Sequence, residues 1–188
     1  RSEKIIKKSK LNSIILRFFN VCSSLKIKNK IIGELHNPET HLIPTIVYKN
    51  LTKKKIYIYG NNYQTKDGSC VRDFIHIKDI CIAIEKSIQF LKNSKENFEI
   101  INIGSSSKKT NFDILKKINN ITKINNKYEV VRRRKGDVDS LTCSIQKAKK
   151  KLKWKPRFSN IEKIINDEIK WVQYLLKNKK FRKFKNYI

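Results

Sequence analysis

The stretch that decides the fold is Ile56–His76, which reads IYIYGNNYQTKDGSCVRDFIH. Its first four residues alternate isoleucine and tyrosine, which is the period of a strand, and the alternation stops at Gly60, where the backbone can turn. Tyr57 and Tyr59 offer flat aromatic surfaces, and Arg72 carries a permanent charge in a planar fork that fits a phosphate group. Aromatic surfaces beside such a fork are what a site for a nucleotide with a diphosphate requires.

Two near-continuous apolar runs lie on either side of this stretch. Ser13–Val21 and Phe98–Ile103 predict strands of a parallel sheet that is covered on both faces. Phe18, Phe19 and Asn20 stand at the carboxyl end of the first run, where ligands collect in open α/β sheets. Packing of the two phenylalanines in the core is an equally good interpretation. The runs indicate an α/β fold.

Amphipathic segments between these runs predict the helices. Ile77–Leu91 is the clearest helix. Its apolar residues at helical spacing, expected to face the core, are Ile77, Ile80, Cys81, Ile84, Ile88 and Leu91. Thr110 is expected to cap a helix over 111–122, and Pro38 to open a helix that reaches Leu51. Cys22–Ile32 predicts a loop.

Composition limits the classes of partner. The 188 residues suffice for one domain with a sizeable core, and the formal net charge is +28. Such a charge ordinarily indicates nucleic acid or an acidic membrane. Here lysine is spread through nearly every predicted helix, and lysine, asparagine and isoleucine all have A/T-rich codons, so base composition explains the charge. Nucleic acid is therefore not expected as the main partner, and no apolar run is long enough to suggest a membrane span.

The cysteines and histidines argue against a metal. Four cysteines lie far apart without a C-x-x-C pair, which fits free thiols in a reducing compartment such as the cytoplasm. His36 and His41 are metal ligands by type, but no third ligand lies at helical spacing, so we expect no metal. The chain begins at Arg1 and contains no methionine, which suggests a piece of a longer product or a product whose start was lost.

A second basic cluster follows at residues 132–137, which read RRRKGD. A solvated loop is the simplest interpretation of such a run. Four cations in succession repel one another, however, and a bound anion would relieve that repulsion.

Several blocks together resemble the UDP-glucose 4-epimerases of the extended short-chain dehydrogenase/reductase family. They are LRFFNV at 16–21, GE at 33–34 with PETHLIP at 38–44, YG through VRDFIH at 59–76, NIG at 102–104, RRKGD at 133–137 and WKP at 154–156. They occur in the family's order over nearly the whole chain. The set is highly specific, although each block alone is weak.

The resemblance implies a role for particular residues. Phe19 is similar to the position that touches the nicotinamide end of the cofactor, and Phe18 lies beside it. The implied substrate-binding residues are Asn20, His41, Leu42, Tyr57, Ile58, Tyr59, Arg72, Arg134 and Asp137. Among them Arg72 and Arg134 would clamp the diphosphate, and Asp137 would accept a ribose hydroxyl, as two forks and a short acid can.

Two family motifs do not occur in this sequence: the glycine-rich turn that holds NAD and the Y-x-x-x-K pair that performs catalysis. Ser2–Ile6 resembles the end of the catalytic helix. The chain therefore resembles the C-terminal half of an epimerase, which joins the C-terminal part of a Rossmann-type parallel sheet to a smaller mixed α/β substrate-binding domain. The expected segments are 1–32 and 98–124 in the sheet part, and 33–97 and 125–188 in the substrate domain and its linking helix.

The expected function is the UDP-sugar-binding half of a UDP-glucose/UDP-galactose 4-epimerase in galactose metabolism. The resemblance implies NAD in the complete enzyme, not held by this chain alone, together with an N-terminal half as partner and a homodimeric assembly. The chain alone is expected to be inactive. Two other interpretations stay open: another sugar-nucleotide dehydratase or decarboxylase of the superfamily, or a non-enzymatic basic binding protein. The preferred UDP-sugar, and the choice between a fragment and a split subunit, stay open too.

Overall fold

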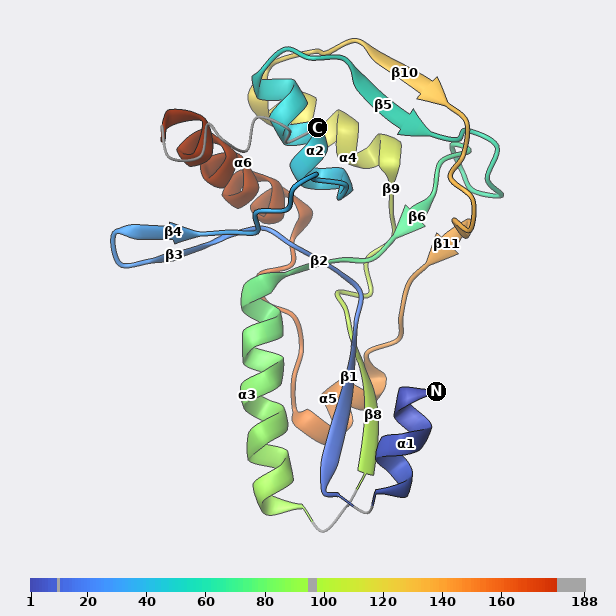
Figure 1. Ribbon diagram of the computed structural model, residues 1–188, viewed down its shortest axis with the longest axis vertical. Helices are drawn as coiled ribbons and strands as arrows, with labels where there is room; N and C mark the ends of the chain where they lie inside the picture. The colour runs from blue at the N-terminus through green and yellow to red at the C-terminus, as the bar shows by residue number, and fades with distance from the viewer. Residues whose placement is uncertain (10, 95–97, 179–188) are drawn as a thin grey trace.

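The chain forms an upper and a lower lobe in the computed structural model, which describes residues 1–9, 11–94 and 98–178 (Figure 1). The lower lobe contains α1 (Ser2–Lys8), β1 (Ser13–Phe18), α3 (Ile77–Asn93), β8 (Phe98–Ile103) and α5 (Gln146–Leu152). The upper lobe contains α2 (Leu42–Leu51), β5 (Ile56–Tyr59), α4 (Asn111–Thr122), β10 (Tyr128–Val131) and α6 (Ile161–Lys177). Residues 95–97 and 179–188, which the expected segments included, lie outside the described residues. The α/β class is confirmed, and no helix in the described ranges is long and apolar enough to cross a membrane.

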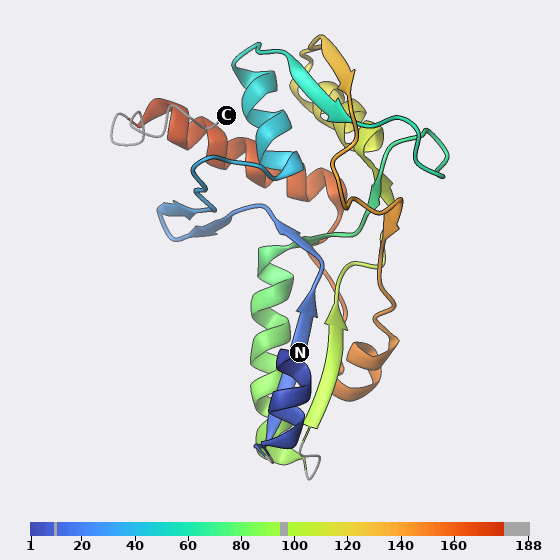
Figure 2. The ribbon, with the colours of Figure 1, turned by 45° about the vertical axis from the view of Figure 1, so that its right-hand side comes forward.

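Short strands join the two lobes. They are β2 (Asn20–Cys22) paired with β7 (Phe74–His76), and the three-stranded set β11 (Ser140–Leu141), β6 (Val71–Arg72) and β9 (Lys109–Thr110). An antiparallel hairpin of β3 (Leu25–Ile27) and β4 (Lys30–Ile32) projects sideways beneath α6. Figure 2 shows the same projection after the molecule is turned. The prediction of a loop over Cys22–Ile32 is therefore wrong in its central part, since a tight hairpin needs few residues and gives little periodic signal.

The lower lobe is built on the parallel pair β1 and β8, in register from Ser13 opposite Phe98 to Phe18 opposite Ile103. Its core contains Ile75, Ile80, Ala83, Ile101, Ile103, Ile145, Ala148, Leu152 and Trp154. The predicted strand Ser13–Val21 is interrupted at Phe19, because the chain leaves β8 there and pairs with β7 instead. Neither β1 nor β8 is buried on both faces within the described residues.

Helix α3 confirms the predicted element but not its buried face. Ile84 and Ile88 are 41% and 51% exposed, whereas Ala83 and Ser87 are buried. The small side chains allow α3 to approach β1 and α5 closely, which turns the larger isoleucines outward. An apolar helix face thus remains uncovered by the described part of the chain.

In the upper lobe α2, α4 and α6 pack together, and α2 also contacts β5 of the parallel pair β5 and β10. Ile56 and Ile58 are fully buried, whereas Tyr57 and Tyr59 point to the other side of the strand, as the alternation of a strand requires. The core they join contains Ile43, Ile46, Val47, Phe74, Ile114, Leu115, Ile118, Ile164, Ile165 and Val172. One face of β5 therefore stabilises the lobe and leaves its tyrosines on the other.

The ends of α2 and α4 illustrate two kinds of helix start. The Thr110 side chain accepts a hydrogen bond from the Asp113 amide, and the Asp113 carboxylate accepts one from the Thr110 amide, which confirms the predicted cap as a capping box. The predicted start of α2 at Pro38 is wrong: the helix begins at Leu42 with His41 as its N-cap. A turn intervenes, because the His41 amide donates to Glu39 Oε1 at 2.7 Å.

Gly68 fixes the loop between β5 and β6. Its φ is +76°, and a Cβ atom there would overlap the backbone carbonyl of Asn61. We expect Gly68→Ala to destabilise the fold by about 1–3 kcal/mol in urea unfolding. Gly136 is the matched control, since its φ is +88° but a Cβ atom added there would meet no atom within 4 Å. Equal losses for the two alanine variants would show that the overlap at Asn61 is without consequence.

Candidate functional site

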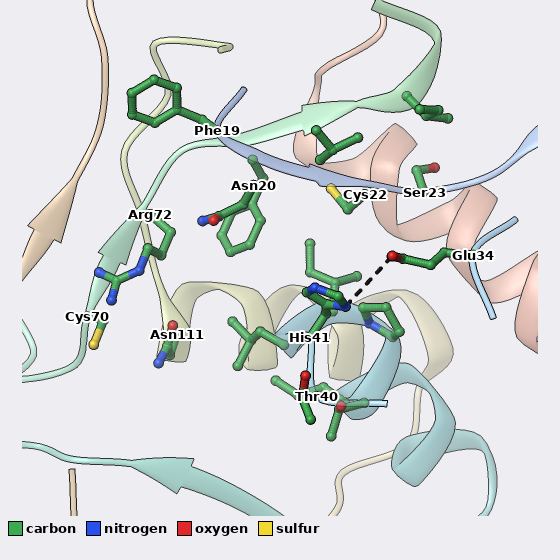
Figure 3. Close-up of a pocket in the computed structure, with 18 of the residues that line it drawn as sticks. Phe19, Asn20, Cys22, Ser23, Glu34, Thr40, His41, Cys70, Arg72 and Asn111 are labelled. Atoms are coloured by element: carbon green, nitrogen blue, oxygen red, sulfur yellow. Dashed lines mark ion pairs between the residues drawn. The ribbon is translucent and has the colours of Figure 1, made fainter. Parts of the chain in front are cut away.

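A cavity of about 740 Å³ lies between the lobes' connecting strands and the upper helices. Nine of the eleven residues predicted to bind cofactor or substrate line it, although they come from segments far apart in the sequence. These nine are Phe19, Asn20, His41, Leu42, Tyr57, Tyr59, Arg72, Arg134 and Asp137. Figure 3 shows Asn20, Arg72 and His41 around a common space, each from a different element.

Three polar residues of the cavity lie at or just beyond the ends of strands. Asn20 opens β2 at the point where the chain leaves the β1–β8 pair, and its backbone amide donates to the Asp73 carbonyl at 3.0 Å. Arg72 ends β6, and Arg134 follows β10 in the basic cluster. The three segments belong to three separate short pairings, β2 with β7, β6 with β11 and β9, and β10 with β5, and all three line the cavity.

Arg72 is held firmly at the cavity wall. Its Nη1 donates to the carbonyl oxygens of Val71 and Val138, both at 2.9 Å, and its Nη2 lies 3.3 Å from Asp137 Oδ1. Only 14% of its side chain is exposed. The guanidinium therefore stays in one orientation, which lowers the entropic cost of binding an anion.

Arg134 is placed by an aromatic ring. Its guanidinium carbon lies 4.0 Å from the centroid of the Tyr59 ring, and Arg133 stacks in the same way on Tyr63 at 4.1 Å. Burial raises the pKa of Tyr63 to about 12, so its phenol is neutral at physiological pH. Arg133 and Arg134 are thus each held against a tyrosine of the deciding stretch, while residues 132–136 as a whole form an exposed loop, as the simplest interpretation of the run predicted.

Two helices begin at the cavity. His41, Leu42, Ile43 and Pro44 at the start of α2 line it, as does Asn111, the first residue of α4. The amino end of a helix carries a partial positive charge and unpaired amide groups, which favour an anion. At α4 these amides are already bonded to Asp113, Cys70, Ser69 and Thr110, so the positive groups at the cavity are Arg72, Arg134 and the amino end of α2.

Two predicted residues do not reach the cavity. Ile58 is fully buried in the upper core, because it points away from the side on which Tyr57 and Tyr59 lie. Phe18, the last residue of β1, is 46% exposed and is not among the lining residues. Successive side chains of a strand point to opposite faces, so Phe18 and Phe19 lie on different sides. The sequence blocks that match the epimerases do not show this alternation.

Several lining residues were not predicted. They include Cys22, Glu34, Thr40, Cys70, Phe74 and Asn111. Asn111 was detectable, because it directly follows the predicted cap Thr110 and so marks a helix start. Cys22 was not, and burial raises its pKa well above the ordinary value of a thiol, so it lines the cavity as a protonated, apolar group.

Parallel strands with a cavity at their ends, lined by Arg72 and Arg134 as well as by Glu34 and Asp137, define an α/β protein of Rossmann type. The chain belongs to the family described as GDP-mannose 4,6 dehydratase, whose model matches residues 3–167. The resemblance to UDP-glucose 4-epimerases is confirmed. The chain is 38% identical over 157 residues to the UDP-glucose 4-epimerase of Streptococcus mutans, an alignment that covers 83% of this chain and 46% of that protein.

Solved structures give the same result. A crystal structure of a UDP-glucose 4-epimerase matches with a TM-score of 0.83 and 35% identity, over 94% of this chain and 54% of that one. The UDP-glucose 4-epimerase of Brucella ovis in complex with NAD matches with a TM-score of 0.81 and 28% identity, over 91% and 53% of the two chains. The chain thus spans about half the length of the relatives it matches.

Proposed function

We propose that this chain is the UDP-sugar-binding part of a UDP-glucose 4-epimerase. The observation that carries the proposal is the convergence of Arg72, Arg134 and the amino end of α2 on one cavity. A diphosphate presents two negative groups, and two guanidinium forks with the amino end of α2 match them. The similarity to enzymes named UDP-glucose 4-epimerase supports UDP-sugar as the ligand.

Other residues of the cavity are assigned to the uracil, the ribose and the sugar diphosphate of the UDP-sugar. Tyr57 and Tyr59 lie on the exposed side of β5, and we assign them to the uracil, which would share these rings with Lys49 over Tyr57 and Arg134 over Tyr59. Asp137 accepts from Arg72 and can accept a ribose hydroxyl through its second oxygen, which lies 3.4 Å from the Tyr63 hydroxyl. Asn20, with one amide donor and one acceptor side, suits the sugar diphosphate.

NAD belongs to the complete enzyme in this proposal. In a 4-epimerase the cofactor supplies the hydride chemistry at C4 of the sugar, and the protein binds and orients the substrate. Phe19 at the cavity is the residue that fits the nicotinamide end, whereas the glycine-rich turn for the pyrophosphate does not occur in these 188 residues. We therefore assign NAD binding to an N-terminal half as the partner of this chain, and we propose that the complete enzyme is a homodimer.

A second candidate is another sugar-nucleotide enzyme, since the matching family model is described as GDP-mannose 4,6 dehydratase. Calorimetric titration of UDP and GDP into the protein assembled with a cofactor-binding half separates the candidates. We expect UDP to bind at least ~10-fold more tightly, because the relatives with 38% and 35% identity are named UDP-glucose 4-epimerases. Tighter binding of GDP would contradict the epimerase proposal and favour the dehydratase.

The uncovered apolar surface predicts how the chain behaves alone. Ile84 and Ile88 of α3 are exposed, and among the described residues β1 pairs with β8 alone. Such faces and edges favour association. We expect the isolated chain to be oligomeric or loosely packed in sedimentation, and compact when co-expressed with an N-terminal epimerase half. A monodisperse monomer with strongly protected amides in β1 and β8 would show a self-sufficient domain.

The free cysteines agree with the expected compartment. Cys22, Cys70, Cys81 and Cys143 form no disulfide. We propose a cytoplasmic location on this basis, since thiols persist under reducing conditions.

A further inference from the structure

Four side chains with metal-binding atoms meet at one end of the cavity. Glu34 and His36 follow β4, and Glu39 and His41 precede α2. One ligand atom of each lies within 4.8 Å of the others. Figure 3 shows Glu34 and His41 pointing toward one another across the start of α2. The four come from a single bent segment with the spacing E-x-H-x-x-E-x-H.

The pairs within the cluster are close. His36 Nδ1 lies 2.9 Å from Glu34 Oε1, and His41 Nδ1 lies 2.8 Å from Glu39 Oε1 and 3.7 Å from Glu34 Oε2. The two imidazole centroids are 4.9 Å apart. Two imidazole nitrogens and two carboxylates, all of them possible metal ligands, therefore already face the same small space.

Glu39 gives an independent indication of a ligand. Its side chain is fully buried, and in the described part of the chain its Oε2 atom has no hydrogen-bond partner. A buried carboxylate oxygen without a donor is costly, and a cation is one of the few groups that can compensate it. Its other oxygen is the one that contacts His41.

We propose that Glu34, His36, Glu39 and His41 form a binding site for a divalent cation, with Zn²⁺ the best match. Imidazole nitrogens and carboxylate oxygens are zinc ligands, and four of them satisfy its tetrahedral preference. Ligand atoms about 2.1 Å from a tetrahedral ion lie about 3.4 Å from one another. The ligand atoms now lie within 4.8 Å of one another and would move closer on binding the ion.

The electrostatics of the surroundings agree with a cation. Glu168 of α6 is buried nearby, and burial, with the negative charges of Glu39 and Glu34, raises its pKa to about 8. This local negative potential exists within a chain whose formal net charge is +28. A bound dication would offset the negative charges of Glu34 and Glu39.

The sequence-based expectation of no metal rested on helical spacing. The ligands instead lie on a turn before α2, where residues two and three apart meet, so that spacing was the wrong criterion. A metal there would fix the end of β4 to the start of α2 at the cavity rim. Zinc binding at this cluster requires no particular nucleotide in the cavity.

The test is a zinc titration of the full 188-residue chain, purified without a histidine tag and in the absence of nucleotide. Competition with a chromophoric chelator is expected to show one Zn²⁺ per chain. Glu39→Gln, which keeps the side-chain shape, should weaken binding at least ~10-fold, and the double variant His36→Ala/His41→Ala should abolish it. Circular dichroism of each variant establishes that its helices are retained.

Cysteines are the competing ligands, so Cys81→Ser is the matched control because Cys81 is exposed. This variant should bind zinc as the parent does. The Co²⁺-loaded parent should lack the near-ultraviolet thiolate-to-cobalt absorption band that a cysteine ligand produces. The proposal is overturned if the parent binds no zinc, if that band appears, or if Glu39→Gln binds as tightly as the parent. The last result would mean that the cluster is two His–Glu hydrogen-bonded pairs.

Discussion

Purified on its own, the 188-residue chain is expected to convert no UDP-galactose into UDP-glucose, even with added NAD. Its sequence contains neither a G-x-G-x-x-G turn nor a Y-x-x-x-K pair, so the hydride carrier and the proton-transferring groups of the proposed reaction have no place in it. A coupled assay that reports UDP-glucose measures this directly. Turnover of the pure chain above a no-protein blank would contradict the proposal that NAD binding and the catalytic groups belong to a separate N-terminal half.

Reconstitution is the positive arm of the same experiment. Co-expression with the N-terminal half of the Streptococcus mutans enzyme, a 38% identical relative, is expected to give turnover that neither half shows alone. The same half co-expressed with an Arg134→Ala chain is the matched control, since that variant keeps the surfaces of α3 and β1 that would meet the partner.

Removing either arginine fork is expected to weaken UDP binding by about 1.5–3 kcal/mol, the scale of hydrogen bonds to charged groups. Arg72→Ala and Arg134→Ala should each show this loss in calorimetry on the assembled protein. Arg132→Ala is the control within the same basic run, because Arg132 is exposed and is not among the residues that line the cavity. It should bind UDP as the parent does.

Uridine separates a phosphate clamp from a structural role. Without phosphates, uridine should bind the parent and both variants alike. Arg72 also donates to the carbonyls of Val71 and Val138, so its removal affects the wall of the cavity as well. Arg134, which stacks on Tyr59, gives the cleaner result. Equal losses for uridine and UDP would mean that the arginines hold the fold and not the phosphates.

Local signals were enough to predict several elements. The capping box of Thr110 and Asp113 fixed the start of α4, and helical spacing fixed the existence of α3. The Ile-Tyr alternation predicted β5 within its observed bounds. These features depend on residues a few positions apart, so the sequence alone contains them.

Features that depend on distant partners were predicted less well. The strand Ser13–Val21 splits because β7 captures residues after Phe19, and α3 turns Ile84 outward because Ala83 and Ser87 fit against β1. Hydropathy does not record which neighbour each face will meet. The exposed apolar face of α3 is also expected if another polypeptide segment covers it.

The candidate site shows the same contrast. Arg72 and Asp137, 65 positions apart, meet at 3.3 Å, and the resemblance to the epimerases had brought both into one predicted site. Ile58 was wrongly predicted to bind substrate, because a matching sequence block identifies a strand but not which of its side chains face the cavity. The cluster of Glu34, His36, Glu39 and His41 was missed because it forms on a bend, for which no periodic signal exists.

Hydrogen exchange on the assembled protein, with and without saturating UDP-glucose, tests the central claim most directly. If the cavity binds the UDP-sugar, protection should rise together in four segments that the sequence keeps apart: 41–46, 57–60, 70–74 and 132–137. They hold the start of α2, the tyrosines of β5, Arg72 and Arg134. Protection that is unchanged in these segments, or that rises only outside them, would contradict the claim that this chain carries the UDP-sugar site.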